Sequence, residues 1–151
     1  MNDNSSYIRH MRKEDIQQVY EIERKSFPYP FGEVLITNIY FTAPELCFVI
    51  EYERELVGFL LGGYAGVEKQ THILSVAILE KYRGLGFGKQ ILLHFLERSS
   101  LLGYTSTKLE VNVDSEGIIK MYEELGFKIA SRIRKYYQDN SDAFLMIRNA
   151  Q

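Results

Sequence analysis

The segment from Leu74 to Leu96 constrains the fold of this chain more than any other. It begins inside an apolar run rich in β-branched residues, 73–79, passes through three glycines within 84–88, and ends in an amphipathic stretch. This pattern predicts a strand, a glycine turn and a helix. Glycine lacks a Cβ, so backbone N–H groups in such a turn can converge on an anion beside the positive end of the helix dipole. The turn is therefore a candidate phosphate-binding loop.

The spacing of the glycines decides which phosphate ligand fits. A dinucleotide fingerprint requires G-x-G-x-x-G and a P-loop requires G-x-x-x-x-G-K-[ST], and the chain matches neither. It carries Arg83-x-x-Gly86-x-Gly88, which resembles the R/Q-x-x-G-x-G/A loop that binds pyrophosphate in the GNAT superfamily of acetyl-CoA-dependent N-acetyltransferases. The pattern is short, so a plain glycine turn between a strand and a helix stays open as the alternative.

Length and charge bound the classes of protein to which the chain can belong. Its 151 residues favour a single domain, 1–151, in which the mostly polar residues 1–6 are expected to form a flexible tail. A formal net charge of −2 provides no attractive field for a polyanion, so neither nucleic acid nor an anionic membrane is expected as a partner. Small ligands or peptides fit this composition better.

Cysteine usage and apolar runs bear on the compartment. Cys47 is the only cysteine, so no disulfide can form within the chain. It lies in an apolar run, 46–50, which favours a buried small side chain over a nucleophile. No apolar run approaches the length of about 18 residues that spans a membrane, and the first residues do not match a signal peptide. We therefore expect the reducing cytoplasm.

Hydrophobic periodicity predicts the elements in the order β-α-α-β-β-β-α-β-α-β-β. Two prolines after Ser26 separate the first two helices, while Ser115 is a candidate N-cap and Gly103 and Gly126 are candidate helix stops. This order is typical of a mixed α/β sheet with antiparallel ends. The predicted ranges are strand 7–11, helices 15–26 and 33–41, strands 45–52, 56–64 and 73–79, a helix ending near 102, strand 107–113, helix 116–125, and strands 127–137 and 143–148.

The element order resembles the GNAT fold, a single domain with a mixed central sheet flanked by helices. Tyr122, Gly126 and Phe127 match the superfamily's second signature, Y-x-x-x-G-F. Four further segments resemble the protein N-terminal α-acetyltransferase branch, which includes the bacterial enzyme that acetylates ribosomal protein S18. These segments are 26–33, 72–78, 109–111 and 135–143. The similarity covers residues 7–148.

The resemblance implies acetyl-CoA as the acetyl donor, no metal, and N-terminal segments of proteins as substrates, with ribosomal proteins among the candidates. Ser115 stands where the family usually has Asn, and Ile118 where it usually has Ala. Serine keeps a hydroxyl near the pantetheine arm but lacks the second function of the amide. The residues that the resemblance assigns to acetyl-CoA are Val76, Ala77, Ile78, Arg83, Gly84, Leu85, Gly86, Phe87, Gly88, Lys89, Ser115 and Tyr122.

The implied reaction, attack of an amine on the acetyl thioester, needs an unprotonated nitrogen. A peptide α-amine is about 10–20% neutral at pH 7 and a lysine amine about 0.04%, so an N-terminus needs only a modest base. Glu110 is the candidate base, because it is a carboxylate in the middle of a strand with apolar neighbours and matches the base of the bacterial branch. His72 matches a second position and is expected to hold the water that relays the proton. A paired sheet-face residue for Glu110 and a strand end for His72 are the alternatives.

Tyr122 matches the superfamily tyrosine that points at the cofactor sulfur. A phenol is a weaker acid than a thiol by about 1.5 pKa units, so we expect a hydrogen bond to the thiolate rather than full proton transfer. The alternative is a core aromatic on an amphipathic helix.

Two groups of large side chains outside the regular elements are expected to close over the first residues of the peptide. A satellite hydrophobic cluster is the alternative for the first group. The residues are Phe27, Pro28, Tyr29 and Phe31, followed much later by Tyr136 and Tyr137.

Two rival functions stay open from the sequence. A GNAT enzyme that acts on a lysine side chain or a small amine would need the same acetyl-CoA loop but no grip on a peptide. A non-catalytic acyl-CoA-binding module would keep 83–88 and would not require a carboxylate at Glu110.

Overall fold

The computed structural model describes residues 5–150, in which the predicted order of helices and strands is confirmed. Residues 1–4 of the predicted tail lie outside the described residues, and Ser6 already belongs to the first strand. Short 3-10 helices occupy Lys13–Asp15 (η1), Pro44–Leu46 (η2) and Glu80–Tyr82 (η3). The main elements are β1 (Ser6–His10), α1 (Ile16–Ser26), α2 (Glu33–Thr42), β2 (Cys47–Tyr52), β3 (Glu55–Tyr64), β4 (Gln70–Ile78), α3 (Phe87–Leu101), β5 (Ser106–Asn112), α4 (Glu116–Glu124), β6 (Lys128–Ile133) and β7 (Ala143–Asn149).

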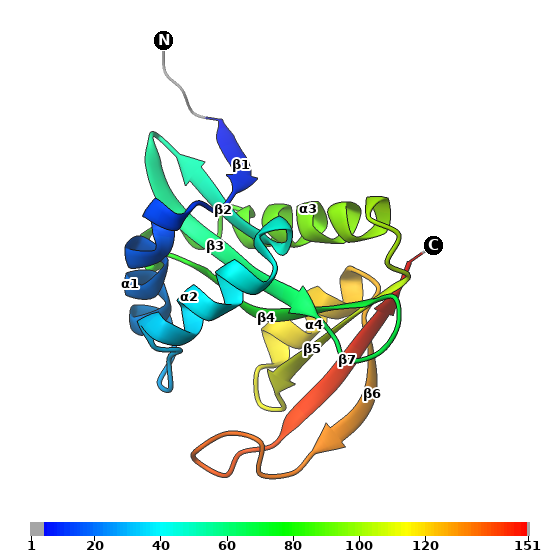
Figure 1. Ribbon diagram of the computed structural model, residues 1–151. Coiled ribbons are helices and arrows are strands. Elements are labelled where there is room, and N and C mark those ends of the chain that lie inside the picture. Colours follow the sequence, from blue (N-terminus) through cyan, green and yellow to red (C-terminus); the bar gives the residue numbers. More distant parts are fainter. Residues whose placement is uncertain (1–4, 151) are drawn as a thin grey trace.

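The strands of the described residues form one mixed sheet in the order β1-β2-β3-β4-β5-β7-β6 (Figure 1). Every neighbouring pair is antiparallel except β4 and β5, which are parallel and are connected through α3. The single-domain mixed sheet flanked by helices that the sequence predicts is therefore confirmed.

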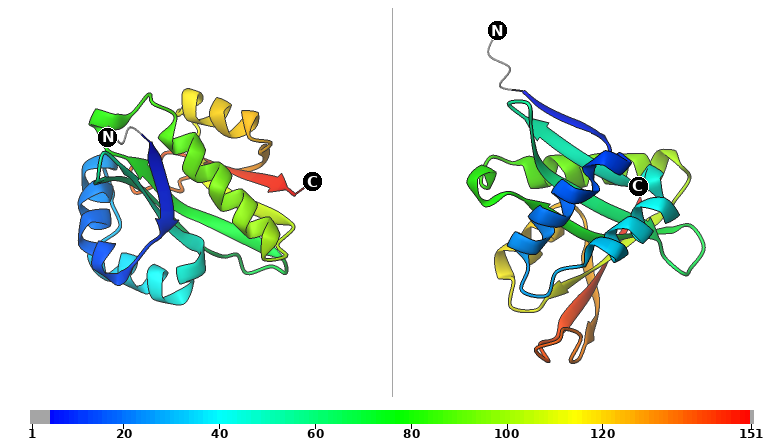
Figure 2. Two further views of the ribbon diagram at one scale, coloured as in Figure 1. Left: turned by 90° about the horizontal axis from the view of Figure 1, so that it is seen from above. Right: turned by 60° about the vertical axis from the view of Figure 1, so that its left-hand side comes forward.

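Helices cover both faces of the sheet (Figure 2). One hydrophobic cluster joins α3 and α4 to the sheet through residues such as Phe95, Ile119 and Leu109. A second joins α1 and α2 to the opposite face, with Val19 and Ile36 among its members. Strands between two helical layers are expected to be apolar on both faces, and β3 is buried along most of its length.

The sheet splits between β4 and β5. Their pairing is limited to Gln70–His72 against Ser106–Lys108, after which the two strands part. A bulge adds to this change of direction, because the register of β3 against β4 skips Leu74 between Leu61 and Gly62. Beyond His72, the edge of β4 that faces β5 has no strand partner within residues 5–150. Backbone N–H and C=O groups on that side are therefore available to a ligand, except the Ile78 carbonyl, which accepts a hydrogen bond from Arg83 Nε.

Several boundary predictions are wrong in part. The strand predicted at 73–79 runs from Gln70 to Ile78, so His72 lies inside β4 and not at its end. The predicted strand 127–137 ends at Ile133, because Lys135 has a left-handed backbone (φ +52°) and gives its N–H to the Asp142 carboxylate instead of to a strand partner. Ser115 does precede α4, but its hydroxyl makes no cap hydrogen bond. Gly103 and Gly126 follow α3 and α4 with positive φ, as helix stops do.

Cys47 is fully buried, as the sequence predicts. None of the helices within residues 5–150 is both long and apolar enough to cross a membrane. The same residues contain no group of three His, Cys, Asp or Glu side chains that could hold a metal ion.

Candidate active site

The glycine turn after β4 has the backbone geometry of an anion-binding loop. Gly84 (φ +81°) and Gly86 (φ +87°) are left-handed, and a Cβ at either would meet nothing within 4 Å. Backbone conformation, not crowding, is therefore what requires glycine at both positions. The first helical bond of α3 runs from Gln90 N–H to Gly86 C=O at 3.1 Å. The N–H groups of the preceding turn have no helical acceptor, and these are the groups that hold phosphate oxygens at helix N-termini.

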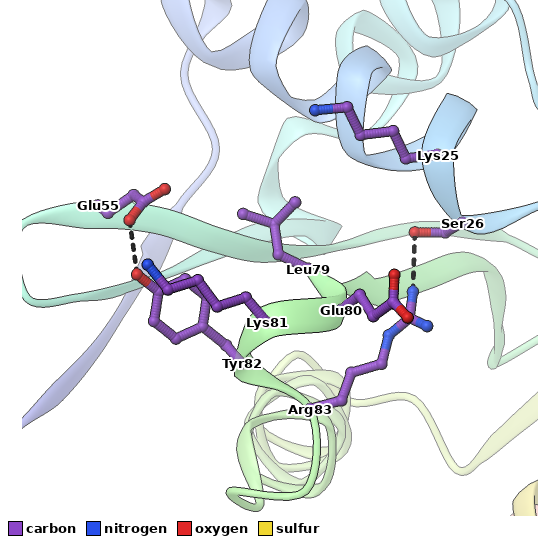
Figure 3. A pocket seen from close by; sticks show the side chains of 8 residues that line it. All are labelled: Lys25, Ser26, Glu55, Leu79, Glu80, Lys81, Tyr82 and Arg83. Atoms are coloured by element: carbon purple, nitrogen blue, oxygen red, sulfur yellow. Dashed lines mark hydrogen bonds between the residues drawn. The ribbon is translucent and has the colours of Figure 1, made fainter.

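Arg83 does not turn its guanidinium toward the α3 end of the loop. Its Nε donates to the Ile78 carbonyl at 2.8 Å and its Nη2 donates to Ser26 Oγ at 3.4 Å. Figure 3 shows the side chain pointing from the loop to Ser26 at the end of α1, on the rim of a pocket of about 300 Å³. In this structure the loop thus presents backbone N–H groups to an anion, while Arg83 links it to α1.

His72 on β4 and Glu110 on β5 meet where the two strands part. His72 Nε2 lies 2.7 Å from Glu110 Oε2, and Lys108 Nζ donates to Glu110 Oε1 at 3.3 Å. Lys108 is the register partner of His72 and lies two residues before Glu110, so alternation places all three side chains on the face opposite α3 and α4. The side chains of His72 and Glu110 are 18% and 11% exposed, which leaves the pair accessible.

Charge decides the protonation state of Glu110. Burial acts to raise the pKa of the Glu110 carboxyl, but the hydrogen bond and charge of His72 and the Lys108 ammonium outweigh it. The pKa of Glu110 therefore lies below its ordinary value, and the carboxylate is ionised at neutral pH. Glu110 is thus a paired residue on the face of the sheet. One of its two partners is His72, the second residue that the sequence predicts to take part in proton transfer.

Tyr122 extends from α4 into the hydrophobic core beside Phe127, with its ring centroid 5.6 Å from that of Phe127. Burial, followed by the charge of Tyr137, raises the pKa of Tyr122 to about 12. Among the described residues its hydroxyl has no hydrogen-bond partner, although Tyr122 is only 6% exposed. A hydroxyl without a protein partner is available to a ligand.

The loop between β6 and β7 is folded around two aspartates. Asp142 accepts hydrogen bonds from the Lys135 N–H and from Arg132 Nε, and Asp139 accepts them from the N–H and hydroxyl of Ser141. Such side chain to backbone bonds stabilise a tight loop. They fix the segment that carries the two tyrosines of the predicted peptide site.

Tyr136 and Tyr137 pack edge to face, with ring centroids 4.9 Å apart. Burial, then the charges of Tyr136 and Glu110, raise the pKa of Tyr137 to about 12. Burial and the charge of Glu110 also raise the pKa of Tyr136. Because Tyr137 also affects Tyr122, Glu110 and the three tyrosines share one electrostatic environment.

The segment between α1 and α2, which we call the lip and define as residues 27–32, is only partly a core cluster. Phe31 packs against the hydrophobic cluster beneath α1 and α2, whereas Phe27 and Tyr29 are 37% and 43% exposed. Pro28 is also exposed. The lip and the β6–β7 loop both lie toward the lower end of the molecule in Figure 1.

Two residues of this region were not singled out from the sequence. Lys108 lies two positions before Glu110, so strand alternation already placed it on the same face. Glu23 occupies an inward position of α1 and is 2% exposed. A carboxylate on the apolar face of an amphipathic helix was the signal that could have identified it.

Comparisons with known proteins agree on one family. A model described as the acetyltransferase (GNAT) family matches residues 16–127. The chain is similar to an N-alpha-acetyltransferase of Sulfurisphaera tokodaii, with 32% identity over 92% of this chain and 90% of the relative. It is also similar to a putative [ribosomal protein bS18]-alanine N-acetyltransferase of Bacillus subtilis, with 33% identity over 92% of each chain. The solved structure of Ard1 from Thermoplasma volcanium superposes with a TM-score of 0.92 at 29% identity, covering 97% of this chain and 98% of the other.

Proposed function

This chain belongs to the acetyltransferase (GNAT) family, and from that membership we propose that it transfers the acetyl group of acetyl-CoA to the free α-amine of protein N-termini. A relative named N-alpha-acetyltransferase, at 32% identity, supports this class of substrate. The B. subtilis relative is named for ribosomal protein bS18, so ribosomal N-termini in the cytoplasm are the first candidates. The observation that carries the proposal is the His72–Glu110 pair at the point where β4 and β5 part.

The split in the sheet supplies a place for acetyl-CoA, which brings the activated acetyl group to the site. The pantetheine arm would lie along the free edge of β4 at Val76, Ala77 and Ile78, as an added strand does. The amides at the start of α3 would hold the pyrophosphate, and Ser115 would bind near the arm. Two features of the protein without ligand support this placement of acetyl-CoA: the left-handed glycines of the turn and the unpaired edge of β4.

The His72–Glu110 pair would accept the proton of the incoming amine, directly or through one water. A carboxylate with a lowered pKa is a weak base, so the pair is matched to an amine that is partly neutral at pH 7. About 10–20% of a peptide α-amine meets that condition, against about 0.04% of a lysine amine. This difference favours an N-terminus over a lysine side chain as the substrate.

Tyr122 would stabilise the sulfur as the thioester bond breaks. Its pKa of about 12 lies above that of a thiol, which is about 8.5, so the phenol would keep its proton and donate a hydrogen bond to the thiolate. A donor held in a largely buried site is worth more than the same donor in water, because the low dielectric strengthens it.

The lip and the tyrosines of the β6–β7 loop would enclose the first residues of the peptide. Phe27 and Tyr29 provide exposed rings from the lip, and the β6–β7 loop provides the exposed ring of Tyr136 and the half-buried ring of Tyr137. Phenol hydroxyls can bind the peptide backbone while the rings surround the first side chain.

The test is an acetylation assay with acetyl-CoA and paired peptides that differ only in whether the N-terminus is free or blocked. We expect transfer to the free termini only. Transfer to lysine side chains of the blocked peptides alone would replace this proposal with the lysine or small-amine alternative. Binding of acetyl-CoA without transfer to any amine would support the non-catalytic module.

A further inference from the structure

Glu23 is a buried carboxylate that the proposed chemistry does not use. It lies in the last turns of α1 and is 2% exposed. Within residues 5–150, no Lys, Arg or His forms an ion pair with it. Burying a carboxylate costs free energy unless its oxygens accept hydrogen bonds. The groups that donate to the Glu23 oxygens therefore indicate the role of this side chain.

The two oxygens of Glu23 join two parts of the proposed active site. The Phe31 N–H, near the end of the lip, donates to Glu23 Oε2 at 2.9 Å. The Ser75 hydroxyl, on β4 next to the bulge, donates to Glu23 Oε1 at 2.5 Å. Ser75 directly precedes Val76, the first of the residues proposed to hold the pantetheine arm. Glu23 therefore connects the lip to the strand on which acetyl-CoA would lie.

The lip has few other ways to be held by its backbone. Pro28 and Pro30 carry no N–H. Of the remaining residues of 28–32, the Phe31 N–H is the one whose hydrogen bond is found among the described residues. At the other end, the Ser26 hydroxyl accepts a long bond from Arg83. The two ends of the lip continue the helices, because the Phe27 N–H donates to the Glu23 carbonyl at 3.2 Å and the Gly32 carbonyl accepts from the Ile36 N–H at 3.1 Å. Without the Glu23 carboxylate, the residues between those ends, 28–31, would be held by packing alone.

From these contacts we propose that Glu23 is a positioning residue, which holds the lip at a fixed place against β4 and so determines how tightly the peptide substrate binds. This inference rests on the proposed function, because it assigns the lip to the peptide. Burial raises the pKa of the Glu23 carboxyl, and either protonation state preserves the connection, since a protonated carboxyl still accepts through one oxygen and can donate from the other.

The experiment compares two substitutions of similar size. Glu23→Gln keeps an oxygen for the Phe31 N–H and an amide group for Ser75, whereas Glu23→Leu keeps the packing and loses both hydrogen bonds. We expect Glu23→Leu to raise the KM for a free N-terminal peptide about tenfold while the KM for acetyl-CoA stays within about twofold. Glu23→Gln should keep both within about threefold. Glu21→Gln, on the same helix with an exposed side chain, is the control and should change neither.

Equal increases in the KM for peptide and for acetyl-CoA, or a wild-type peptide KM in Glu23→Leu, would overturn the proposal. If Glu23→Leu does not fold, Ser75→Ala removes only the link to β4. We then expect the peptide KM to rise about threefold with the acetyl-CoA KM unchanged, and no rise would overturn the proposal.

A second measurement does not depend on the substrate. Hydrogen exchange at the Phe31 amide should be at least about tenfold faster in Glu23→Leu than in the wild type, while amides in the middle of α1 keep their rates. Unchanged exchange at Phe31 would show that Glu23 does not hold the lip. Faster exchange in a protein that acetylates no N-terminal peptide would instead contradict the proposed function and leave the structural role of Glu23 intact.

Discussion

Glu110 owes its charge state to two neighbours, of which the sequence pattern indicates only one. Lys108 shares its face by simple alternation, two residues away. His72 is separated from Glu110 by 38 positions and reaches it because β4 and β5 are parallel and adjacent. The apolar neighbours of this carboxylate, together with the resemblance to the bacterial N-terminal acetyltransferases, singled out Glu110 from the sequence. Its lowered pKa could not be predicted there, because it depends on contacts across strands.

Glu110→Gln should reduce kcat by about 10² or more, the usual contribution of a general base, while the KM for acetyl-CoA stays near that of the wild type. The amide preserves the shape of the side chain and can still bond to His72, but it cannot accept a proton. Steady-state kinetics at saturating peptide provide the measurement. An equal loss of kcat and of acetyl-CoA binding would remove Glu110 from the role of base.

Lys108→Met should move the acid limb of the pH–rate profile to higher pH. The Lys108 ammonium helps to lower the pKa of Glu110, so its removal raises that pKa, and the carboxylate is then protonated, and activity lost, at a higher pH than in the wild type. The check is kcat/KM between about pH 3 and 7, a range that includes the ordinary carboxyl pKa and the values below it, with Lys13→Met as a control at an exposed position in η1. An unshifted limb would mean that Glu110 does not control the profile.

At the scale of the elements, hydrophobic periodicity predicted each α-helix and strand in order, but neither the three short 3-10 helices nor every element boundary. The strand that was predicted to reach 137 stops at Ile133, because the Lys135 N–H donates to the carboxylate of Asp142, the last residue of the hairpin loop. Hydrophobic periodicity does not encode such a contact between side chain and backbone. Ser115 has the residue type of an N-cap without making the bond. Glycines were more informative, since Gly84 and Gly86 both adopt the left-handed backbone that the turn requires.

Gly86→Ala tests whether the shape of this turn matters for acetyl-CoA. A left-handed backbone costs a non-glycine residue about 1–2 kcal/mol, and the substitution has no steric cost because a Cβ there meets nothing within 4 Å. We expect a loss of stability of about that size and a higher KM for acetyl-CoA. Gly66→Ala, which is equally open and has no positive φ, should alter neither. Unfolding by urea and steady-state kinetics separate the two effects.

At the scale of the whole molecule, burial of Glu23 makes the stability of the fold depend on pH. The pKa of its carboxyl is raised in the folded protein, so the folded state binds the proton more tightly than the unfolded chain. Protonation of Glu23 therefore increases the free energy of unfolding as the pH falls from the raised pKa toward the ordinary value near 4.5. Above the raised pKa, Glu23 is ionised in both states and this increase is absent.

Glu23→Gln does not titrate, so its stability relative to the wild type should be greatest near pH 8 and should decline toward pH 5. Urea unfolding of both proteins across this range measures the difference. Parallel curves for the two proteins would contradict a raised pKa. Other carboxylates, such as Asp15 and Asp142, have lowered pKa values and act in the opposite direction in both proteins, so they cancel in the comparison.

The division of the sheet has a consequence for how the protein responds to its ligand. Within residues 5–150, strand pairing joins β4 to β5 at only three residue pairs, and beyond them the two parts of the sheet are joined by side chains and by the core beneath α3 and α4. A molecule bound where the strands part would add further contacts between these two parts. Occupancy and cohesion of the fold would then rise together, since any ligand that binds only the folded chain stabilises it by mass action. The free energy of unfolding should therefore be higher with acetyl-CoA bound than without it.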